Sequence, residues 1–302
     1  MNQESIQHTI ILFYKYVEID NPEKLRDRQR SLCEKLGLKG RVIVAKEGIN
    51  ATLEGTTKNI NEYLKEYLSD LRFSDTHIKK STGDGDSFPR LSVKVRKEIV
   101  TLGLEDDINP NEITGKHLKP EELKQWYKSG KDFVIVDMRN DYEFKVGRFK
   151  NSIMPRLQNF RDVPKALGDV EKLRDKTVLT VCTGGVRCEK ASGLLVREGF
   201  KDVYQLDGGI VSYMEKFPAQ EFQGSLYVFD KRIIMDFDSV NNLGDKHVVI
   251  GKCDKCGLSN ERYVNCKRPE CNKHFICCES CSEPDGRSFC SIECREKMMI
   301  TS

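Results

Sequence analysis

The stretch Cys182-Thr183-Gly184-Gly185-Val186-Arg187-Cys188-Glu189-Lys190 decides the fold of the central part of the chain. The apolar run at residues 177–182 predicts a buried strand, and residues 189–198 follow a helical pattern. The paired glycines let the backbone curl between that strand and a helix that begins just after Arg187. A strand, a tight loop and a helix in this order are typical of parallel α/β sheets, which carry functional groups at the carboxyl edge.

The sequence on both sides of this loop continues the alternation of strands and helices. Apolar runs at residues 133–137 and 203–206 predict two more strands, and residues 120–126 and 210–217 predict two more helices. Apolar strands that alternate with helices favour a parallel sheet covered on both faces. We therefore predict a parallel α/β domain at residues 119–220.

The surroundings of Cys182 predict a reactive thiol. The loop residues Thr183, Gly184, Gly185, Val186 and Arg187 would offer the sulfur backbone N–H groups, a helix N-terminus and a guanidinium. All three stabilise a thiolate, so we expect a lowered pKa for Cys182, at the mouth of a glycine-lined pocket. An inert, buried cysteine near a turn is the alternative interpretation.

The length of the loop separates two kinds of chemistry. Four residues lie between Cys182 and Arg187, whereas cysteine phosphatases have five in the corresponding loop. The smaller cradle suits a persulfide sulfur better than a phosphoryl group. Cys188 is a candidate for resolving an oxidised or persulfidated Cys182, and a small buried side chain is the more usual role for such a residue.

Residues 1–103 predict a domain of a different kind. The pattern gives a strand at 10–17, a helix at 21–36, strands at 41–45 and 48–55, a helix at 60–71 and a strand at 91–95. This βαββαβ order predicts a ferredoxin-like sandwich. Cys33 falls within the first helical pattern and is expected in the core. The polar, acidic residues 104–118 predict a linker.

The last of these strands carries a row of cations. Alternation along it places Arg90, Lys94 and Arg96 on one face and apolar residues on the other. Such a row on an open sheet face could contact a phosphate backbone, which makes the three residues our nucleic-acid candidates. An ordinary solvated face is the alternative.

The C-terminal region, residues 221–302, holds nine of the twelve cysteines. Its four short-spaced pairs are Cys253 and Cys256, Cys266 and Cys271, Cys278 and Cys281, and Cys290 and Cys294. Eight thiolates would fill two tetrahedral structural zinc sites, and we prefer an interleaved arrangement of first pair with third and second with fourth. Cys277 and His274 are spare candidate ligands, and a disulfide-linked or metal-free tail is the alternative. Residues 224–233 and 247–251 predict short strands.

The composition excludes several classes of protein. The 302 residues carry 50 Lys and Arg against 47 Asp and Glu, so a net charge of +3 excludes a polycation. The apolar runs are far shorter than the roughly 18 residues that span a bilayer. Residues 1–4 show no start of a secretory signal, so we expect a cytoplasmic protein with no membrane contact. There is no GxGxxG fingerprint, and the five histidines are scattered, so no flavin, haem or NAD signature is present.

Several motifs of the central domain resemble those of a rhodanese domain. They are Asp137-Met138-Arg139-Asn140, Glu143, Gly147-Arg148-Phe149, the Cys182 loop, Leu206-Asp207-Gly208-Gly209-Ile210 and Tyr213. Together with residues 48–55 (GINATLEG) and the cysteine-rich tail, they make nearly the whole chain resemble the bacterial rhodanese-domain tRNA uridine hydroxylase family. Members of that family have a ferredoxin-like (acylphosphatase-like) N-terminal domain.

This resemblance implies oxygen-dependent hydroxylation at carbon 5 of the wobble uridine in tRNA. It implies tRNA as partner, molecular oxygen as co-substrate, Cys182 as the essential cysteine, and Asp137 and Arg139 in support of the site. From the residues alone, we add the hypothesis that the Cys182 thiolate adds to carbon 6 of the pyrimidine. Two other functions remain open: a persulfide sulfurtransferase that uses Cys182, and a non-catalytic adaptor.

Overall fold

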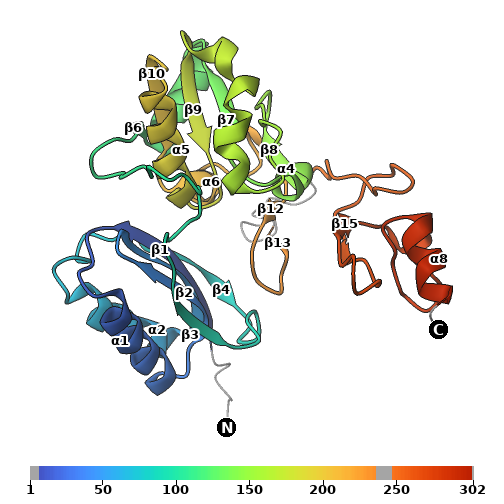
Figure 1. Cartoon of the computed structure of the whole chain (residues 1–302), viewed down its shortest axis with the longest axis horizontal. Helices are drawn as coiled ribbons and strands as arrows, with labels where there is room; N and C mark the ends of the chain where they lie inside the picture. Colours follow the sequence, from blue (N-terminus) through green and yellow to red (C-terminus); the bar gives the residue numbers. More distant parts are fainter. Residues whose placement is uncertain (1–6, 236–246, 301–302) are drawn as a thin grey trace.

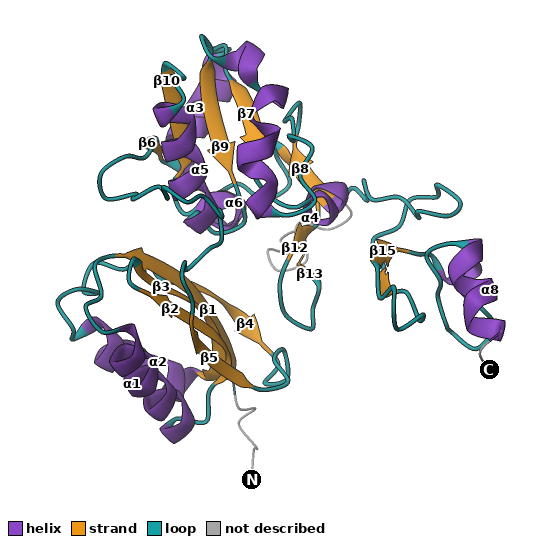
Figure 2. Cartoon of the chain, viewed as in Figure 1, coloured by secondary structure: helices purple, strands orange, loops and turns teal. Residues whose placement is uncertain are grey.

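The computed structural model describes residues 7–235 and 247–300 (Figure 1). The chain forms an N-terminal sheet with two helices, a central α/β unit and a C-terminal region rich in loops (Figure 2). None of the described helices is long and apolar enough to cross a membrane. Residues 1–4, on which the expectation about a secretory signal depends, lie outside the described residues.

The N-terminal unit is a five-stranded sheet with helices on one face (Figure 2). Its elements are β1 (His8–Tyr16), α1 (Pro22–Lys35), β2 (Lys39–Ala45), β3 (Gly48–Thr56), α2 (Thr57–Leu68), β4 (Lys79–Gly83) and β5 (Leu91–Val95). Alternate residues of β1 point to opposite faces of the sheet, as the strand period requires. Ile11 and Phe13 are buried in the core beneath the helices, whereas Leu12 and Tyr14 point to the other face, towards the central unit.

The strand predicted at residues 91–95 does not occupy the position expected of the fourth ferredoxin-like strand. In the sheet order β4-β1-β3-β2-β5, that position beside β1 belongs to β4, and residues 91–95 form β5, an additional edge strand parallel to β2. The sequence of β4, KKSTG, has no apolar pattern that would predict a strand. The strand forms because it pairs with β1. The predicted alternation is present in β5, where Val93 is buried and Lys94 is exposed.

The central unit is built on a parallel sheet in the order β6-β10-β9-β7. Its elements are β6 (Lys116–Leu118), α3 (Pro120–Ser129), β7 (Val134–Asp137), α4 (Asp141–Val146), β8 (Gly147–Phe149), the 3₁₀ helices η1 (Phe160–Asp169) and η2 (Glu171–Leu173), β9 (Thr177–Val181), α5 (Val186–Arg197), β10 (Asp202–Leu206) and α6 (Gly209–Lys216). Helices lie on both faces of the sheet (Figure 1). The predicted parallel sheet covered on both faces is therefore confirmed.

Two local expectations for this unit are wrong. The helix after the Cys182 loop begins at Val186 rather than after Arg187, so Arg187 belongs to its first turn; Cys188 lies in that turn, as expected. The end of the predicted linker is not free chain, because residues 116–118 form β6 and pair with β10. Ile108, in the same segment, is buried in the central core. Its isolated apolar residues anchor the segment although its overall composition is polar.

The C-terminal region begins as an extension of the central unit. Strand β11 (Phe222–Gly224) pairs with β8, and β12 (Leu226–Tyr227) pairs with β13 (Ile234–Met235). The cysteine-rich part contains β14 (Tyr263–Asn265), β15 (His274–Ile276), η3 (Glu279–Cys281) and α8 (Ile292–Ile300). The strand predicted at residues 247–251 is absent: this segment is irregular, and Val248 is 55% exposed, so its apolar residues have no sheet to pack on.

Helix α5 joins the N-terminal and central units through a buried lysine. The Lys190 ammonium lies 2.8 Å from Glu47, between β2 and β3, and 2.9 Å from Glu98, which follows β5. It also forms an ion pair with Asp107 from the connecting segment. The Lys190 side chain is fully buried. A charge in this position is stabilised only while its partners surround it, so the two units are held together next to the Cys182 loop.

Replacing Lys190 with methionine is expected to lower the free energy of unfolding by about 3–5 kcal/mol, because three facing carboxylates lose their counter-charge. Chemical denaturation of the purified protein measures this loss. Lys65→Met, an exposed position on α2, is the matched control and should change stability by less than about 0.5 kcal/mol. The loss should shrink as the pH falls and the carboxylates protonate; a loss independent of pH would contradict the explanation.

Candidate active site

The Cys182 loop is held by two helix N-termini. The Gly185 N–H, at the start of α5, donates a hydrogen bond of 3.2 Å to Cys182 Sγ. From α6, the Ile210 N–H donates to the Cys182 carbonyl at 2.9 Å, and the Val211 N–H donates to the Thr183 carbonyl at 3.1 Å. Gly185 has a φ of +102°, and a Cβ there would lie 2.8 Å from the Tyr14 hydroxyl. The loop therefore requires glycine at this position.

The electrostatics around Cys182 favour the thiolate. Burial raises the pKa of Cys182, but a hydrogen bond from the Cys188 thiol, the charge of Arg187 and the N–H groups of Cys188 and Gly185 outweigh it and lower the pKa to about 6. The pKa of Cys188 is raised by burial and by the neighbouring Cys182. Of the two thiols, Cys182 therefore carries the negative charge and Cys188 serves as a hydrogen-bond donor.

Glu143 fixes Arg187 beside this thiolate. Two hydrogen bonds of 2.6 and 2.8 Å join the Arg187 guanidinium to the Glu143 carboxylate, which also accepts one of 3.0 Å from Thr183 Oγ1. Glu143 is fully buried. Burial raises its pKa, but the charge and hydrogen bonds of Arg187 lower the pKa by more than burial raises it, so the carboxylate is charged. No role is predicted for Glu143 from the sequence; its position three residues after Asn140, in a capping box at the start of α4, was the available signal.

Asp137 and Arg139 lie behind the loop and form a fully buried pair. Arg139 Nη2 lies 2.7 Å from Asp137 Oδ2, and it also donates to the Gly147 carbonyl at 2.6 Å. The Met138 N–H donates to the Val181 carbonyl at 2.9 Å. These contacts join the end of β7 to β8 and to the strand that carries Cys182. The pair is thus placed to support the loop from the protein interior.

The expectation that Cys182 lies at the mouth of a pocket is wrong in one respect. The Cys182 side chain is fully buried, and the loop residues beside it, among them Thr183, Gly184 and Arg187, line a cavity instead. The cause is the N-terminal sheet, because Leu12 and Tyr14 of β1 pack against the loop glycines, where an added Cβ would meet them at 2.9 and 2.8 Å. A contact between distant segments of the chain gives no local sequence signal.

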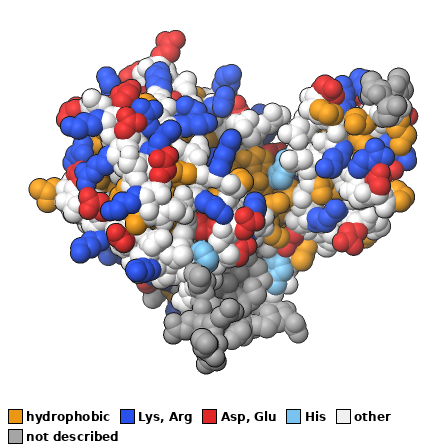
Figure 3. All heavy atoms as spheres, turned by 90° about the horizontal axis from the view of Figure 1, so that it is seen from below, with side chains coloured by type: hydrophobic (Ala, Val, Ile, Leu, Met, Phe, Trp, Pro, Cys, Tyr) orange, Lys and Arg blue, Asp and Glu red, His pale blue; other side chains and the backbone are white. Residues whose placement is uncertain are grey.

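The cavity beside the loop has a volume of about 950 Å³ and lies between three parts of the chain. The open face of the N-terminal sheet, the Cys182 loop and the segment between β12 and β13 all contribute to its wall. Seven Lys or Arg residues line it against three acidic residues, Glu98, Glu215 and Asp230. On the outer face in Figure 3, by contrast, positive and negative side chains are interspersed. The excess of cations inside favours an anionic ligand.

The three nucleic-acid candidates lie along an extension of this cavity. Arg90 and Lys94 line an adjoining groove of about 600 Å³, and Arg96 lines both the groove and the cavity. Arg41 and Phe229 are also common to both. Phe229 is 49% exposed and its ring lies 5.9 Å from the Arg187 guanidinium. The structure thus brings the predicted row of cations to the same face of the molecule as the thiol loop.

Comparisons with known proteins match every part of this architecture. Family models described as UPF0176 acylphosphatase like domain, Rhodanese-like domain and Rhodanase C-terminal match residues 8–99, 119–216 and 223–295. A Bacillus licheniformis protein named tRNA uridine(34) hydroxylase is 46% identical over 292 residues, or 96% of this chain and 88% of that protein. The chain belongs to the tRNA uridine(34) hydroxylase family. A Bacillus velezensis protein of the same name is 44% identical with the same coverage, and the predicted family and fold class are confirmed.

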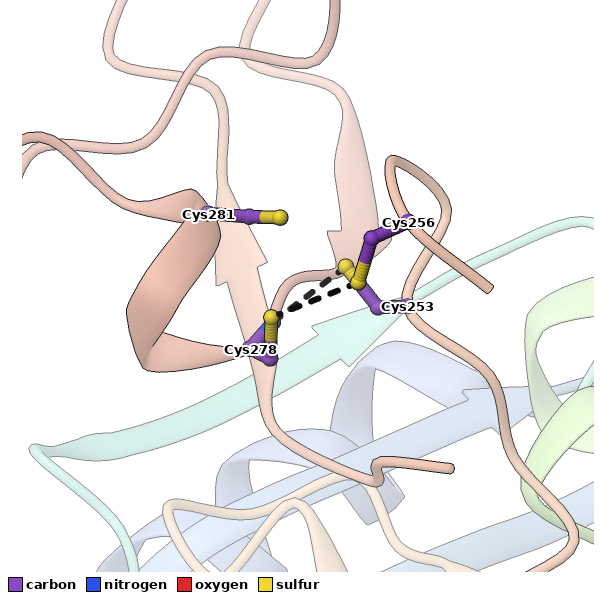
Figure 4. A group of neighbouring side chains, drawn as sticks. All are labelled: Cys253, Cys256, Cys278 and Cys281. Carbon is purple, nitrogen blue, oxygen red and sulfur yellow. Dashed lines mark hydrogen bonds between the residues drawn. The ribbon is translucent and has the colours of Figure 1, made fainter. Parts of the chain in front are cut away.

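In this member of the tRNA uridine(34) hydroxylase family, the eight paired cysteines come together in two groups of four. The first group contains Cys253, Cys256, Cys278 and Cys281, whose sulfur atoms point toward one another (Figure 4), and the second contains Cys266, Cys271, Cys290 and Cys294. The first cysteine pair of the sequence therefore combines with the third, and the second pair combines with the fourth, which is the interleaved arrangement that the spacing predicted.

The sulfur separations fit tetrahedral metal sites. The sulfur atoms of Cys256 and Cys278 lie 3.7 Å apart, and those of Cys271 and Cys290 lie 3.6 Å apart. Zn–S bonds of about 2.3 Å in a tetrahedron require about 3.8 Å. Cys277 and His274 belong to neither group: the Cys277 thiol faces the Cys278 carbonyl, and His274 hydrogen-bonds to Asn265 and Tyr227.

Iodoacetamide can reach the buried Cys182 thiol only when the Leu12 and Tyr14 side chains move aside, which slows the reaction at every pH. The rate is still expected to rise through a midpoint near pH 6, against about 8.5 for free cysteine, because only the thiolate reacts. Iodoacetamide labelling followed by trypsin measures it, since the peptide at residues 177–187 contains Cys182 as its one cysteine. Cys33 is the internal control: burial raises its pKa to about 12, so its labelling should stay low over the same range. A Cys182 midpoint at or above pH 8.5 would contradict the electrostatic account.

Proposed function

We propose that this protein hydroxylates carbon 5 of the wobble uridine, uridine 34, of tRNA, with molecular oxygen as co-substrate and Cys182 as the catalytic thiolate. The observation that carries the proposal is the similarity over nearly the whole chain to relatives named tRNA uridine(34) hydroxylase. The cation-lined cavity beside the thiol loop supports it, because RNA is a polyanion.

The size of the cavity suits one nucleotide. A volume of about 950 Å³ lies at the upper end of the range for small-molecule sites. Enzymes that modify a base must take it out of its stack, and an unpaired loop nucleotide is the cheapest to remove. Uridine 34 would enter the cavity from the anticodon loop, while Arg90, Lys94 and Arg96 contact the phosphates of the adjoining strand.

The chemistry assigned to Cys182 begins with addition to the pyrimidine. The Sγ–C6 bond forms, and the electron pair of the C5–C6 double bond moves to C5 and the O4 carbonyl. C5 then takes one atom of molecular oxygen. The second oxygen atom leaves as water, with two electrons and two protons supplied by a thiol reductant. Loss of the C5 proton and of the Sγ–C6 bond restores the ring and the thiolate.

This mechanism requires the cover over Cys182 to give way when RNA binds. Side chains of β1 lie over the loop, with Leu12 against Gly184 and Tyr14 against Gly185. Rotation of these side chains would let a uridine ring reach the sulfur while the Lys190 ion pairs stay in place.

The test uses purified protein, an anticodon stem-loop RNA and a thiol reductant under ¹⁸O-labelled oxygen. We expect ¹⁸O in the 5-hydroxyuridine, and no product from a uridine analogue that cannot accept addition at carbon 6. Hydroxylation of that analogue at the normal rate would exclude the addition step, and label appearing only from ¹⁸O-labelled water would exclude oxygen as co-substrate.

A second candidate function, persulfide sulfurtransfer, is supported by the small loop cradle with its N–H donor to Cys182 Sγ. Transfer of sulfur from thiosulfate to cyanide by the wild type but not by Cys182→Ser, without hydroxylation of RNA, would favour it. In this reaction, or in the hydroxylation, Cys188 could resolve an oxidised Cys182, and the hydrogen bond between the two thiols supports that role.

We further propose that the two cysteine groups hold structural zinc, because protein sulfur would fill all four positions of each ion. The proposed domain limits are residues 1–103, 119–220 and 221–302, with residues 104–118 as a connection whose last three residues, 116–118, pair with the central sheet as β6. A tRNA-modifying function also supports a cytoplasmic location for the protein.

A further inference from the structure

One buried cation in the described part of the chain forms no ion pair. Four Lys or Arg residues in the described part of the chain are at most 7% exposed: Lys79, Arg139, Arg187 and Lys190. Arg139 pairs with Asp137, Arg187 with Glu143, and Lys190 with three carboxylates. Lys79, which is 4% exposed, forms no ion pair or hydrogen bond through its ammonium with any described residue; the Cys182 thiolate and the carboxylates of Asp207, Glu215 and Glu189 attract it without pairing with it. A buried charge without a partner is costly, so such a group calls for a ligand.

The position of Lys79 directs its ammonium to the cavity beside the thiol loop. In the sheet, Lys79 on β4 lies opposite Leu12 on β1, so both side chains project from the same face. Leu12 packs against Gly184, and Lys79 lines the cavity with its Nζ 5.5 Å from the centre of the Tyr14 ring. Its neighbour Lys80 differs, because it is exposed and hydrogen-bonds to Asn61.

Two features of the cavity identify the class of ligand. The wall contains six further Lys or Arg residues, so any ligand there meets a positive potential. Burial lowers the pKa of Lys79, a shift that an anion next to the ammonium would offset. The ligand is therefore an anion small enough to enter a site of nucleotide size.

We propose that Lys79 completes the active site from the N-terminal unit by binding a phosphate of the RNA chain next to the nucleotide held in the cavity. This inference rests on the proposed function, from which the RNA comes. It makes the site composite: the central unit supplies the thiol, and the N-terminal sheet supplies a phosphate contact that positions the uridine over it. Lys79 is thus a substrate-binding residue.

The experiment compares binding of an anticodon stem-loop RNA to the full-length wild type, Lys79→Met, Lys79→Arg and the exposed control Lys65→Met. We expect Lys79→Met to bind roughly tenfold more weakly, and its plot of log affinity against log salt to lose about 0.7 of slope, the value for one single-strand phosphate. Lys79→Arg should recover most of both, and Lys65→Met should match the wild type. The thermal midpoint of Lys79→Met should equal or exceed that of the wild type, because an unpaired buried charge is removed.

A neutral methylphosphonate in place of each phosphate beside uridine 34 then locates the contact. One such replacement should weaken binding to the wild type and leave binding to Lys79→Met unchanged, which is the signature of a coupled pair. If Lys79→Met binds the RNA with the affinity and salt slope of the wild type, the proposal is overturned. If, in addition, the alkylation midpoint of Cys182 rises in that variant, Lys79 acts as a counter-charge to the thiolate instead. Failure of the wild type to bind the RNA would overturn the proposed function as well.

Discussion

A Cys182→Ser protein is expected to hydroxylate an anticodon stem-loop roughly 10³-fold more slowly than the wild type, or not measurably. Serine fits the same space, but the hydrogen bond from Gly185 and the charge of Arg187 cannot ionise a hydroxyl at neutral pH. The measurement is the initial rate of 5-hydroxyuridine formation under saturating RNA and oxygen.

The matched control is Cys33→Ala, because Cys33 is also fully buried but lies in the core of the N-terminal unit. It should retain most of the activity and lose about 1 kcal/mol or more of stability, as a small core truncation does. A Cys182→Ser protein that keeps more than about a tenth of the wild-type rate would remove the thiolate from the mechanism.

Replacing Cys290 with serine is expected to lower the zinc content from about two ions to about one per chain and to unfold the second cysteine group. The group around Cys290 is closed by sulfur ligands, with Cys271 at 3.6 Å and Cys294 at 3.7 Å. Zinc binding contributes about 10–16 kcal/mol to the folding of small zinc modules, so losing one ligand affects the whole group. Metal analysis and protease sensitivity of residues 247–300 measure the two effects.

Cys277→Ala is the control for that experiment, since Cys277 lies next to Cys278 in the chain but belongs to neither group. It should keep about two zinc ions per chain. Zinc lost to the same degree in both variants would contradict the assignment of ligands, and unchanged zinc in Cys290→Ser would contradict the second site.

The features that could be predicted from the sequence are those with a local signature. The strand, paired glycines and helix around Cys182 follow from consecutive residues. The cysteine groups follow from pair spacing, because two close cysteines must supply ligands to the same side of one metal. The alternation around Val93 likewise requires only the period of a strand.

The features that could not be predicted depend on contacts between distant segments. Strand β4 has no apolar pattern and exists because it pairs with β1, so both the strand and Lys79 on it were missed. The burial of Cys182 depends on Leu12 and Tyr14, which lie about 170 residues before it in the chain. The sequence predicted the thiol loop but not the sheet that covers it.

The residues that follow Cys188 connect the loop to that cover. The Glu189 carboxylate accepts hydrogen bonds from Tyr14 at 3.0 Å, from Gln205 at 2.8 Å and from Thr114 at 3.0 Å, and Lys190 binds the carboxylates of the N-terminal unit. A motif that reads as one loop therefore has two roles: its first half holds the thiolate, and its second half fixes the N-terminal sheet over it.

Nucleoside mass spectrometry of tRNA from a strain that lacks the gene tests whether this protein hydroxylates the wobble uridine through Cys182. We expect 5-hydroxyuridine and nucleosides derived from it to disappear from the wobble position, to return with the wild-type gene and to stay absent with the Cys182→Ser gene. The proposed function would be contradicted if the modification persisted in the deletion strain, or if it returned when that strain carried the Cys182→Ser gene.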